Sequence, residues 1–256
     1  MTDLLRLYRL IRDYKKIEFI SEFEFSKNIS INYDTVHDQI SFDKSYIDHA
    51  ITSFSSNSSL LSALLKNQLS KGFAAVDFGG GLGKGFYELD TDVKKHCQSW
   101  LVVEKLKFIK KVPIHLLHRS LSFSDKIENF NVSGSCLKVG YSNSGIQYSG
   151  RMEGVVSELA ELGLDLLVFE RIPLSLSQTD RVLFVRQRSN LRSNYTKNFS
   201  LLGARVFYNF ELLPESRFVG CLQDLGFDVS LEKISGDVFS NLKHRIGLFN
   251  IIARRK

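Results

Sequence analysis

The chain has 256 residues, of which 43% are hydrophobic and 24% are charged, a composition that excludes wholesale disorder. Its 34 Lys and Arg against 28 Asp and Glu give a net charge of +6, which falls short of the excess in histone-like or ribosomal tails. The three cysteines are an odd number spaced far apart, which excludes a disulfide framework and predicts a cytoplasmic protein.

The first 68 residues are predicted to form a helical cover with an irregular patch near 28–43. Apolar residues recur there at helical spacing with arginines between them: Leu4, Leu5, Leu7, Leu10 and Ile11. We favour a helix packed on its own domain; the alternative is a peripheral contact with the inner membrane or an assembly complex. We expect no signal peptide, and no stretch reaches the roughly 20 apolar residues of a spanning helix.

Residues 69–256 alternate between short apolar runs and helical patterns. Strands are expected at 73–78, 100–104, within 113–123, and at 136–141, 165–170, 227–234 and 247–253. Helices are expected at 59–68, within 88–99, and at 152–162 and 212–225. This alternation predicts an α/β domain with a mostly parallel sheet covered on both faces, and the last two strands could form an antiparallel pair at one edge.

A glycine-rich loop follows the first of these strands, with the sequence Val-Asp-Phe-Gly-Gly-Gly-Leu-Gly at 76–83. Open α/β sheets bind ligands at this edge, and glycine lets the backbone approach a ligand closely. A phosphate-binding P-loop would need glycine at Phe78, and a dinucleotide fingerprint would need glycine at Lys84 or Phe86. The pattern Asp-x-Gly-x-Gly-x-Gly instead fits the first motif of methyltransferases that use S-adenosylmethionine.

Two acids give this interpretation a chemical basis. S-adenosylmethionine carries a positive ammonium at its amino-acid end, and Asp77 can face that group directly or through water. Glu104 ends the next predicted strand and can accept hydrogen bonds from the ribose hydroxyls, as acids do in dinucleotide folds. The alternative is a glycine-rich turn that binds no ligand.

From about residue 70 to its end, the chain resembles methyltransferases encoded in bacterial gene clusters for surface polysaccharides (O-antigen or capsule). The motifs are VDFGGGLG at 76–83, WLVVEK at 100–105, SLSF at 120–123, GIQY at 145–148, FERIPLS at 169–175, DRV at 180–182 and the block at 206–229. The resemblance implies a Rossmann-like class I methyltransferase fold, a seven-stranded sheet with an antiparallel C-terminal strand, and S-adenosylmethionine as cofactor. Lys105 and the Phe-Tyr-Asn at 207–209, where Trp is common, depart from the family pattern.

The resemblance also assigns roles by position. It implies a cofactor loop of Asp77, Gly79, Gly81 and Gly83, a ribose contact at Glu104, adenine contacts at Ser122 and Phe123, and positions near the transferred methyl group at Ser142 and Asn143. Core packing is the alternative for Phe123, and turn formation is the alternative for Ser142 and Asn143.

Candidate catalytic residues follow the fourth and fifth strands, with Tyr148 and Arg171 in front, Gln147 and Glu170 beside them, and His244 approaching from the C-terminal hairpin. Each has a structural alternative, such as core packing for Tyr148 or an ion pair for Arg171. An arginine-rich recognition insertion is expected near 181–210. We interpret it first as a solvated hairpin, then as a lid over a glycan or phosphoglycan, and last as a nucleic-acid surface.

We therefore predict a methyltransferase that O-methylates a glycan or glycan phosphate in surface-polysaccharide biosynthesis, without a nucleic-acid partner. The cysteines form no Cys-x-x-Cys pair, so we expect no metal. One alternative is a catalytically degenerate subunit that binds partners in a polysaccharide-assembly complex. The other is an NAD(P)-dependent oxidoreductase, which the missing fingerprint glycine disfavours.

Overall fold

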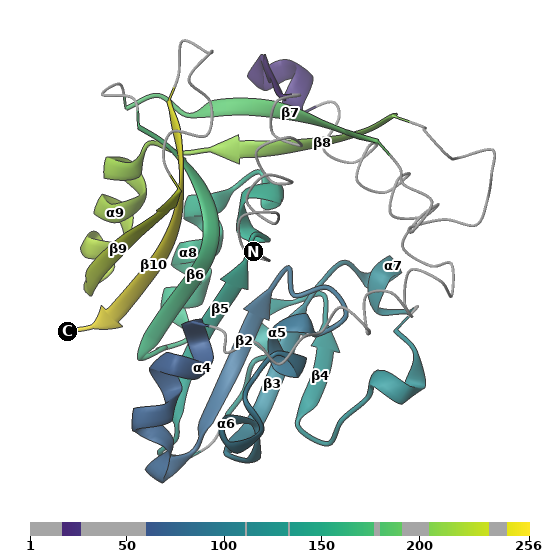
Figure 1. Ribbon diagram of the computed structural model, residues 1–256, viewed down its shortest axis with the longest axis vertical. Helices are drawn as coiled ribbons and strands as arrows, with labels where there is room; N and C mark the ends of the chain where they lie inside the picture. Colours follow the sequence, from purple (N-terminus) through teal and green to yellow (C-terminus); the bar gives the residue numbers. More distant parts are fainter. Residues whose placement is uncertain are drawn as a thin grey trace.

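A seven-stranded sheet forms the centre of the protein in a computed structural model (Figure 1). The structure describes residues 17–26, 60–110, 112–132, 134–176, 180–190, 205–235 and 245–256. The strand order is β4-β3-β2-β5-β6-β10-β9. In chain order the bounds are β2 Phe73–Phe78, β3 Cys97–Val103, β4 Leu121–Ser124, β5 Leu137–Asn143, β6 Leu166–Ser175, β9 Phe227–Ser235 and β10 Ile246–Arg255.

The direction of the strands confirms the predicted fold class. β2, β3, β4, β5 and β6 pair in parallel, whereas the C-terminal strand β10 runs antiparallel to both β6 and β9. This is the Rossmann-like class I methyltransferase fold. The strand order reverses beside β2, which pairs with β3 on one side and with β5 on the other. Open α/β sheets bind ligands outside the carboxyl ends of the strands at such a reversal.

Helices cover both faces of this sheet. α8 (Met152–Glu161) and α9 (Glu215–Asp224) pack on one face, where β2 contributes Ala74 and Val76. α4 (Leu60–Leu65), α5 (Lys84–Tyr87) and α6 (Thr91–Lys95) pack on the other face, where β2 contributes Phe73 and Ala75. Because β2 is buried on both faces, its sequence is a continuous apolar run rather than an alternating one.

A second, three-stranded sheet crosses the side of the molecule toward which the parallel strands point (Figure 1). It consists of β1 (Ile17–Ile20), β7 (Leu183–Asn190) and β8 (Arg205–Leu212), all antiparallel. A hydrogen bond connects the two sheets. The backbone N–H of Ser175, at the end of β6, donates to the carbonyl of Leu213, directly after β8. The arginine-rich segment lies between and partly within β7 and β8. Within the helical cover expected over residues 1–68, residues 17–20 form a strand instead.

The remaining elements are short. They are η1 (Lys66–Lys71), α7 (Leu106–Ile109), η2 (Ile114–Leu116), η3 (Ile127–Asn129) and η4 (Ile146–Ser149). Among the expected boundaries that differ, β3 begins at Cys97 rather than Trp100, and β6 continues beyond Glu170 to Ser175. β10 pairs with β6 from Leu166 to Ser175, with one register shift, so this pairing continues beyond Glu170, where the pairing of β6 with β5 ends. Within the described residues, no helix combines the length and the apolar character needed to span a membrane.

Candidate functional site

The glycine loop connects β2 to α5 at the carboxyl edge of the sheet. Gly79, Gly81 and Gly83 have φ angles of +69°, +60° and +85°, which glycine adopts without strain. The N–H of Gly79 donates to the carbonyl of Val103 at the end of β3 (2.9 Å). A Cβ atom on Gly79 would lie 2.9 Å from the Cα of Gly145, in the turn after β5. The loop is thus held between the ends of two neighbouring strands.

The side chain of Asp77 lies beneath this loop and is 1% exposed. A Cβ on Gly80 would come within 2.3 Å of its Oδ2 atom, so the chain crosses directly over the carboxyl group. The indole N–H of Trp100 donates to Oδ2 (3.2 Å), whereas Oδ1 has no hydrogen-bond partner among the described residues. Burial, helped by the nearby Glu104 and Glu170, raises the pKa of Asp77 to about 8.

Glu104 follows β3 and closes the loop from the other side. Its Oε1 atom accepts the N–H of Gly81 (3.2 Å) and its Oε2 atom accepts the N–H of Lys105 (3.1 Å). Burial raises the pKa of Glu104 against the lowering effect of these hydrogen bonds. The two acids that were expected to face a cofactor therefore lie on either side of the same loop, Asp77 beneath it and Glu104 at its edge.

A third acid completes the edge at the end of β6. Glu170 accepts a hydrogen bond from the Asn143 amide at Oε2 (3.4 Å), while its buried Oε1 atom has no hydrogen-bond partner among the described residues. Burial raises its pKa, and the adjacent Arg171 opposes that shift. The Asn143 amide also donates to the hydroxyl of Tyr141 (3.1 Å). Burial and the charges of Glu170 and Asp77 raise the pKa of this tyrosine.

Arg171 is held in a specific orientation. The Asn143 Oδ1 atom accepts its Nε–H (2.8 Å), and the Asn250 Oδ1 atom accepts its backbone N–H (3.3 Å). Its φ of +57° is unfavourable for a residue with a side chain, and Ser144 opposite has a φ of +55°. The hydroxyl of Ser144 donates to the Arg171 carbonyl (3.2 Å). Strained backbone of this kind concentrates at functional sites.

The predicted residues on β4 and β5 need revision. Ser122 and Phe123 lie inside β4, so they point to opposite faces of the sheet and cannot flank an adenine together. Phe123 is half-buried, and its ring tip approaches Gly83. Ser142 is fully buried, where its hydroxyl donates to the Phe78 carbonyl (2.8 Å) and accepts the N–H of Ile146 (3.1 Å). Ser142 therefore stabilises the turn that follows β5, and turn formation describes its role better than a cofactor contact does.

The three catalytic candidates, Tyr148, Arg171 and His244, differ in where they lie relative to the glycine loop. Arg171 lies at the acid-rich edge. Tyr148 lies on η4, beyond the turn that contacts the glycine loop, and its half-buried ring packs edge-on against Phe210 of the second sheet. His244 lies outside the described residues. Gln147, beside Tyr148, is buried.

Several residues of this edge were not predicted. Trp100 and Tyr141 were assigned only to predicted strands, and only the fold shows that their polar atoms reach the carboxyl groups of Asp77 and Glu170. Asp125, exposed directly after β4, was missed because the strand was expected to end at residue 123. It is next to Glu104, whose N–H donates to the Ser124 carbonyl (2.9 Å). The pattern that singled out Asp77 and Glu104, an acidic residue at the end of a predicted strand, could also have identified Asp125.

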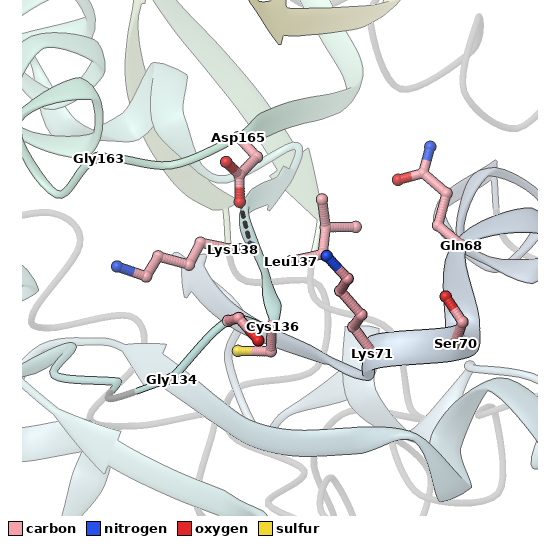
Figure 2. Close-up of a pocket in the computed structure, with 10 residues that line it drawn as sticks. Gln68, Ser70, Lys71, Gly134, Cys136, Leu137, Lys138, Gly163 and Asp165 are labelled. Carbon is pink, nitrogen blue, oxygen red and sulfur yellow. Dashed lines mark hydrogen bonds between the residues drawn. The ribbon is translucent and has the colours of Figure 1, made fainter.

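A separate open pocket of about 600 Å³ lies at the opposite edge, where β2, β5 and β6 begin (Figure 2). Lys71 and Lys138 line it, and the Asp165 carboxylate there accepts the backbone N–H of Lys138 (2.8 Å). Ligands of open α/β sheets bind at the carboxyl ends of strands, so we place the candidate site at the glycine loop. In the described part of the chain, no His, Cys, Asp or Glu cluster is arranged to hold a metal ion.

No family model matches the chain, and no curated protein sequence matches it. Solved structures with a similar chain path include a 1,6-didemethyltoxoflavin-N1-methyltransferase from Burkholderia thailandensis (12% identity, 93% of this chain, 92% of that chain, TM-score 0.49). Another is the sugar N-methyltransferase KedS8 from Streptoalloteichus (11% identity, 79% of this chain, 88% of that chain, TM-score 0.48). Because these similarities concern chain path alone, the function has to be inferred from the residues of the site.

The buried carboxyl of Asp77 predicts a specific pH dependence of stability. The folded state keeps a proton on Asp77 up to a pKa of about 8, whereas the unfolded chain releases it near 3.8. The free energy of unfolding should therefore fall as pH rises between these values. Asp77→Asn should flatten that fall and be more stable than the natural protein above pH 8. Urea unfolding across this pH range measures the free energy of unfolding of the natural protein and of the variant. Asp224→Asn, at an exposed position of α9, should keep the natural slope; an equally steep slope in Asp77→Asn would contradict the assignment.

Proposed function

We propose that this chain is an S-adenosylmethionine-dependent methyltransferase that methylates an oxygen of a glycan or phosphoglycan in surface-polysaccharide biosynthesis. The observation that carries the proposal is the charge of the loop site. Three carboxyl groups with raised pKa values lie at this edge: Asp77 and Glu104 flank the glycine loop, and Glu170, at the end of β6, is close enough to help raise the pKa of Asp77. Two of them keep a buried oxygen without a hydrogen-bond partner among the described residues. Such a site favours a cationic ligand, and S-adenosylmethionine carries both an ammonium and a sulfonium.

The residue types at this edge suit the chemical groups of S-adenosylmethionine. Gly81 would lie under it, because a Cβ at this position would meet no atom within 4 Å and so points into open space. Glu104, besides holding the Gly81 N–H, retains acceptor capacity for the ribose hydroxyls. Asp125 and Phe123 border the place expected for the adenine. Asp77, which keeps its proton up to a pKa of about 8 in the free protein, would lose it when a cation binds nearby and would then supply negative charge from below.

When bound, S-adenosylmethionine supplies an electrophilic methyl group, so the protein has mainly to position the acceptor and exclude water. Arg171, oriented by Asn143, offers its remaining guanidinium donors to a phosphate or carboxylate of the acceptor. Glu170 takes the proton from the acceptor hydroxyl, since a raised pKa makes a carboxylate a better base near neutral pH. Tyr148 helps to hold that hydroxyl.

A calorimetric titration with three ligands tests the proposal. S-adenosylmethionine and S-adenosylhomocysteine should bind, and NAD should not. Incubation with polysaccharide precursors, followed by mass spectrometry, should then show the mass of one added methyl group. Binding of neither sulfur nucleoside would contradict the proposal. Binding without a methylated product from any precursor would instead favour a binding subunit of an assembly complex.

A matched pair of glycine substitutions locates the ligand. Gly81 and Gly163 have φ angles of +60° and +66°, and neither has an atom within 4 Å of a built Cβ. Gly81→Ala and Gly163→Ala should each lower the free energy of unfolding by about 1 kcal/mol through left-handed strain. Only Gly81→Ala should weaken S-adenosylhomocysteine binding, by about tenfold or more, because its methyl group enters the ligand's space. Equal affinity in the two variants would place the ligand elsewhere.

A further inference from the structure

A strongly basic surface segment borders the glycine loop. It comprises residues 105–119 and contains α7 and η2. Its sequence holds four lysines, two histidines and one arginine, and no aspartate or glutamate occurs before Asp125. In Figure 1, α7 lies beside β4 at the carboxyl edge of the main sheet. The 105–119 segment therefore gives this flank a positive charge, in contrast to the acids inside the site.

The same segment exposes aliphatic side chains. Leu106 is 50% exposed, Ile114 83% and Leu117 56%. These are three of the five large apolar residues that are exposed in the described part of the chain. Isolated exposed apolar residues need no explanation, but three within twelve positions indicate an interaction surface.

These side chains project from an anchored backbone. Phe108 and Leu116 of the same segment are buried against Leu82 of the glycine loop. The hydroxyl of Tyr87 donates to the Leu116 carbonyl (2.5 Å), and the N–H of Leu117 donates to the Ile114 carbonyl (3.0 Å). The segment thus buries one set of its apolar residues and holds the other set outward.

We propose that the 105–119 segment docks the protein on a membrane surface that contains anionic lipids. Aliphatic side chains interleaved with lysines suit the boundary between headgroups and acyl chains, where the apolar atoms insert and the cations meet lipid phosphates. A nucleic-acid surface would instead need aromatic rings for base stacking, and the only ring of the aromatic amino acids Phe, Tyr and Trp here, that of Phe108, is buried. The inference does not rest on the proposed methyltransferase activity.

Vesicle flotation with the full chain tests this docking surface. The natural protein should bind vesicles of phosphatidylcholine with phosphatidylglycerol more tightly than vesicles of phosphatidylcholine alone. The triple variant Leu106→Ser, Ile114→Ser, Leu117→Ser should lose binding to anionic vesicles on the order of tenfold. The double variant Lys110→Gln, Arg119→Gln should lose a similar factor and show a weaker salt dependence. Ile234→Ser, which removes an exposed isoleucine of β9, is the matched control and should bind like the natural protein.

Two results would overturn the proposal. The first is natural protein that shows no preference for anionic over neutral vesicles. The second is a folded triple variant, with an unchanged unfolding transition, that binds as the natural protein does. That second result would assign membrane binding to another part of the chain, such as the amphipathic pattern at its beginning.

Discussion

The backbone after β2 passes directly over a buried carboxyl group, and much of the site depends on this crossing. Side chains at Gly80 or Gly85 would collide with Asp77 or with the aromatic rings beside it. Trp100 holds the carboxyl group from below, and Gly145 lets the next turn approach the loop from the side. The glycines here serve the packing of the protein on itself as well as the approach of a ligand.

This crossing also sets the electrostatics of the carboxyl edge. Asp77 is too buried to be stabilised by water, so its negative charge needs a cation that the described part of the chain does not place against it. Glu104, after β3, and Glu170, in β6, add negative charge near this carboxyl group. The positive groups lie farther out: Arg171 is held by Asn143, and the 105–119 segment lies on the flank. An acidic centre with basic surroundings suits a cationic cofactor and an anionic acceptor or surface.

Local sequence patterns were sufficient to predict those elements whose own residues form a clear apolar pattern. β2 and α8 could be predicted closely, since each is a clear apolar pattern bounded by glycine or polar residues. β1 could not, because Ile17–Ile20 forms a strand only through pairing with β7, far along the chain. The short edge strand β4 has a mixed pattern, and misplacing its end concealed Asp125. The network around Asn143 and Arg171 depends on Asn250 from β10, a contact without any local signal.

The central claim is that a sulfur nucleoside lies on the Gly79–Gly83 loop. A crystal structure of the protein grown with S-adenosylhomocysteine tests it most directly. Our account predicts electron density over Gly81, with the ribose hydroxyls at Glu104 and the amino-acid end toward the side of Asp77. Density confined to the pocket of Lys71 and Lys138 at the opposite edge, or none at saturating ligand, would contradict the account.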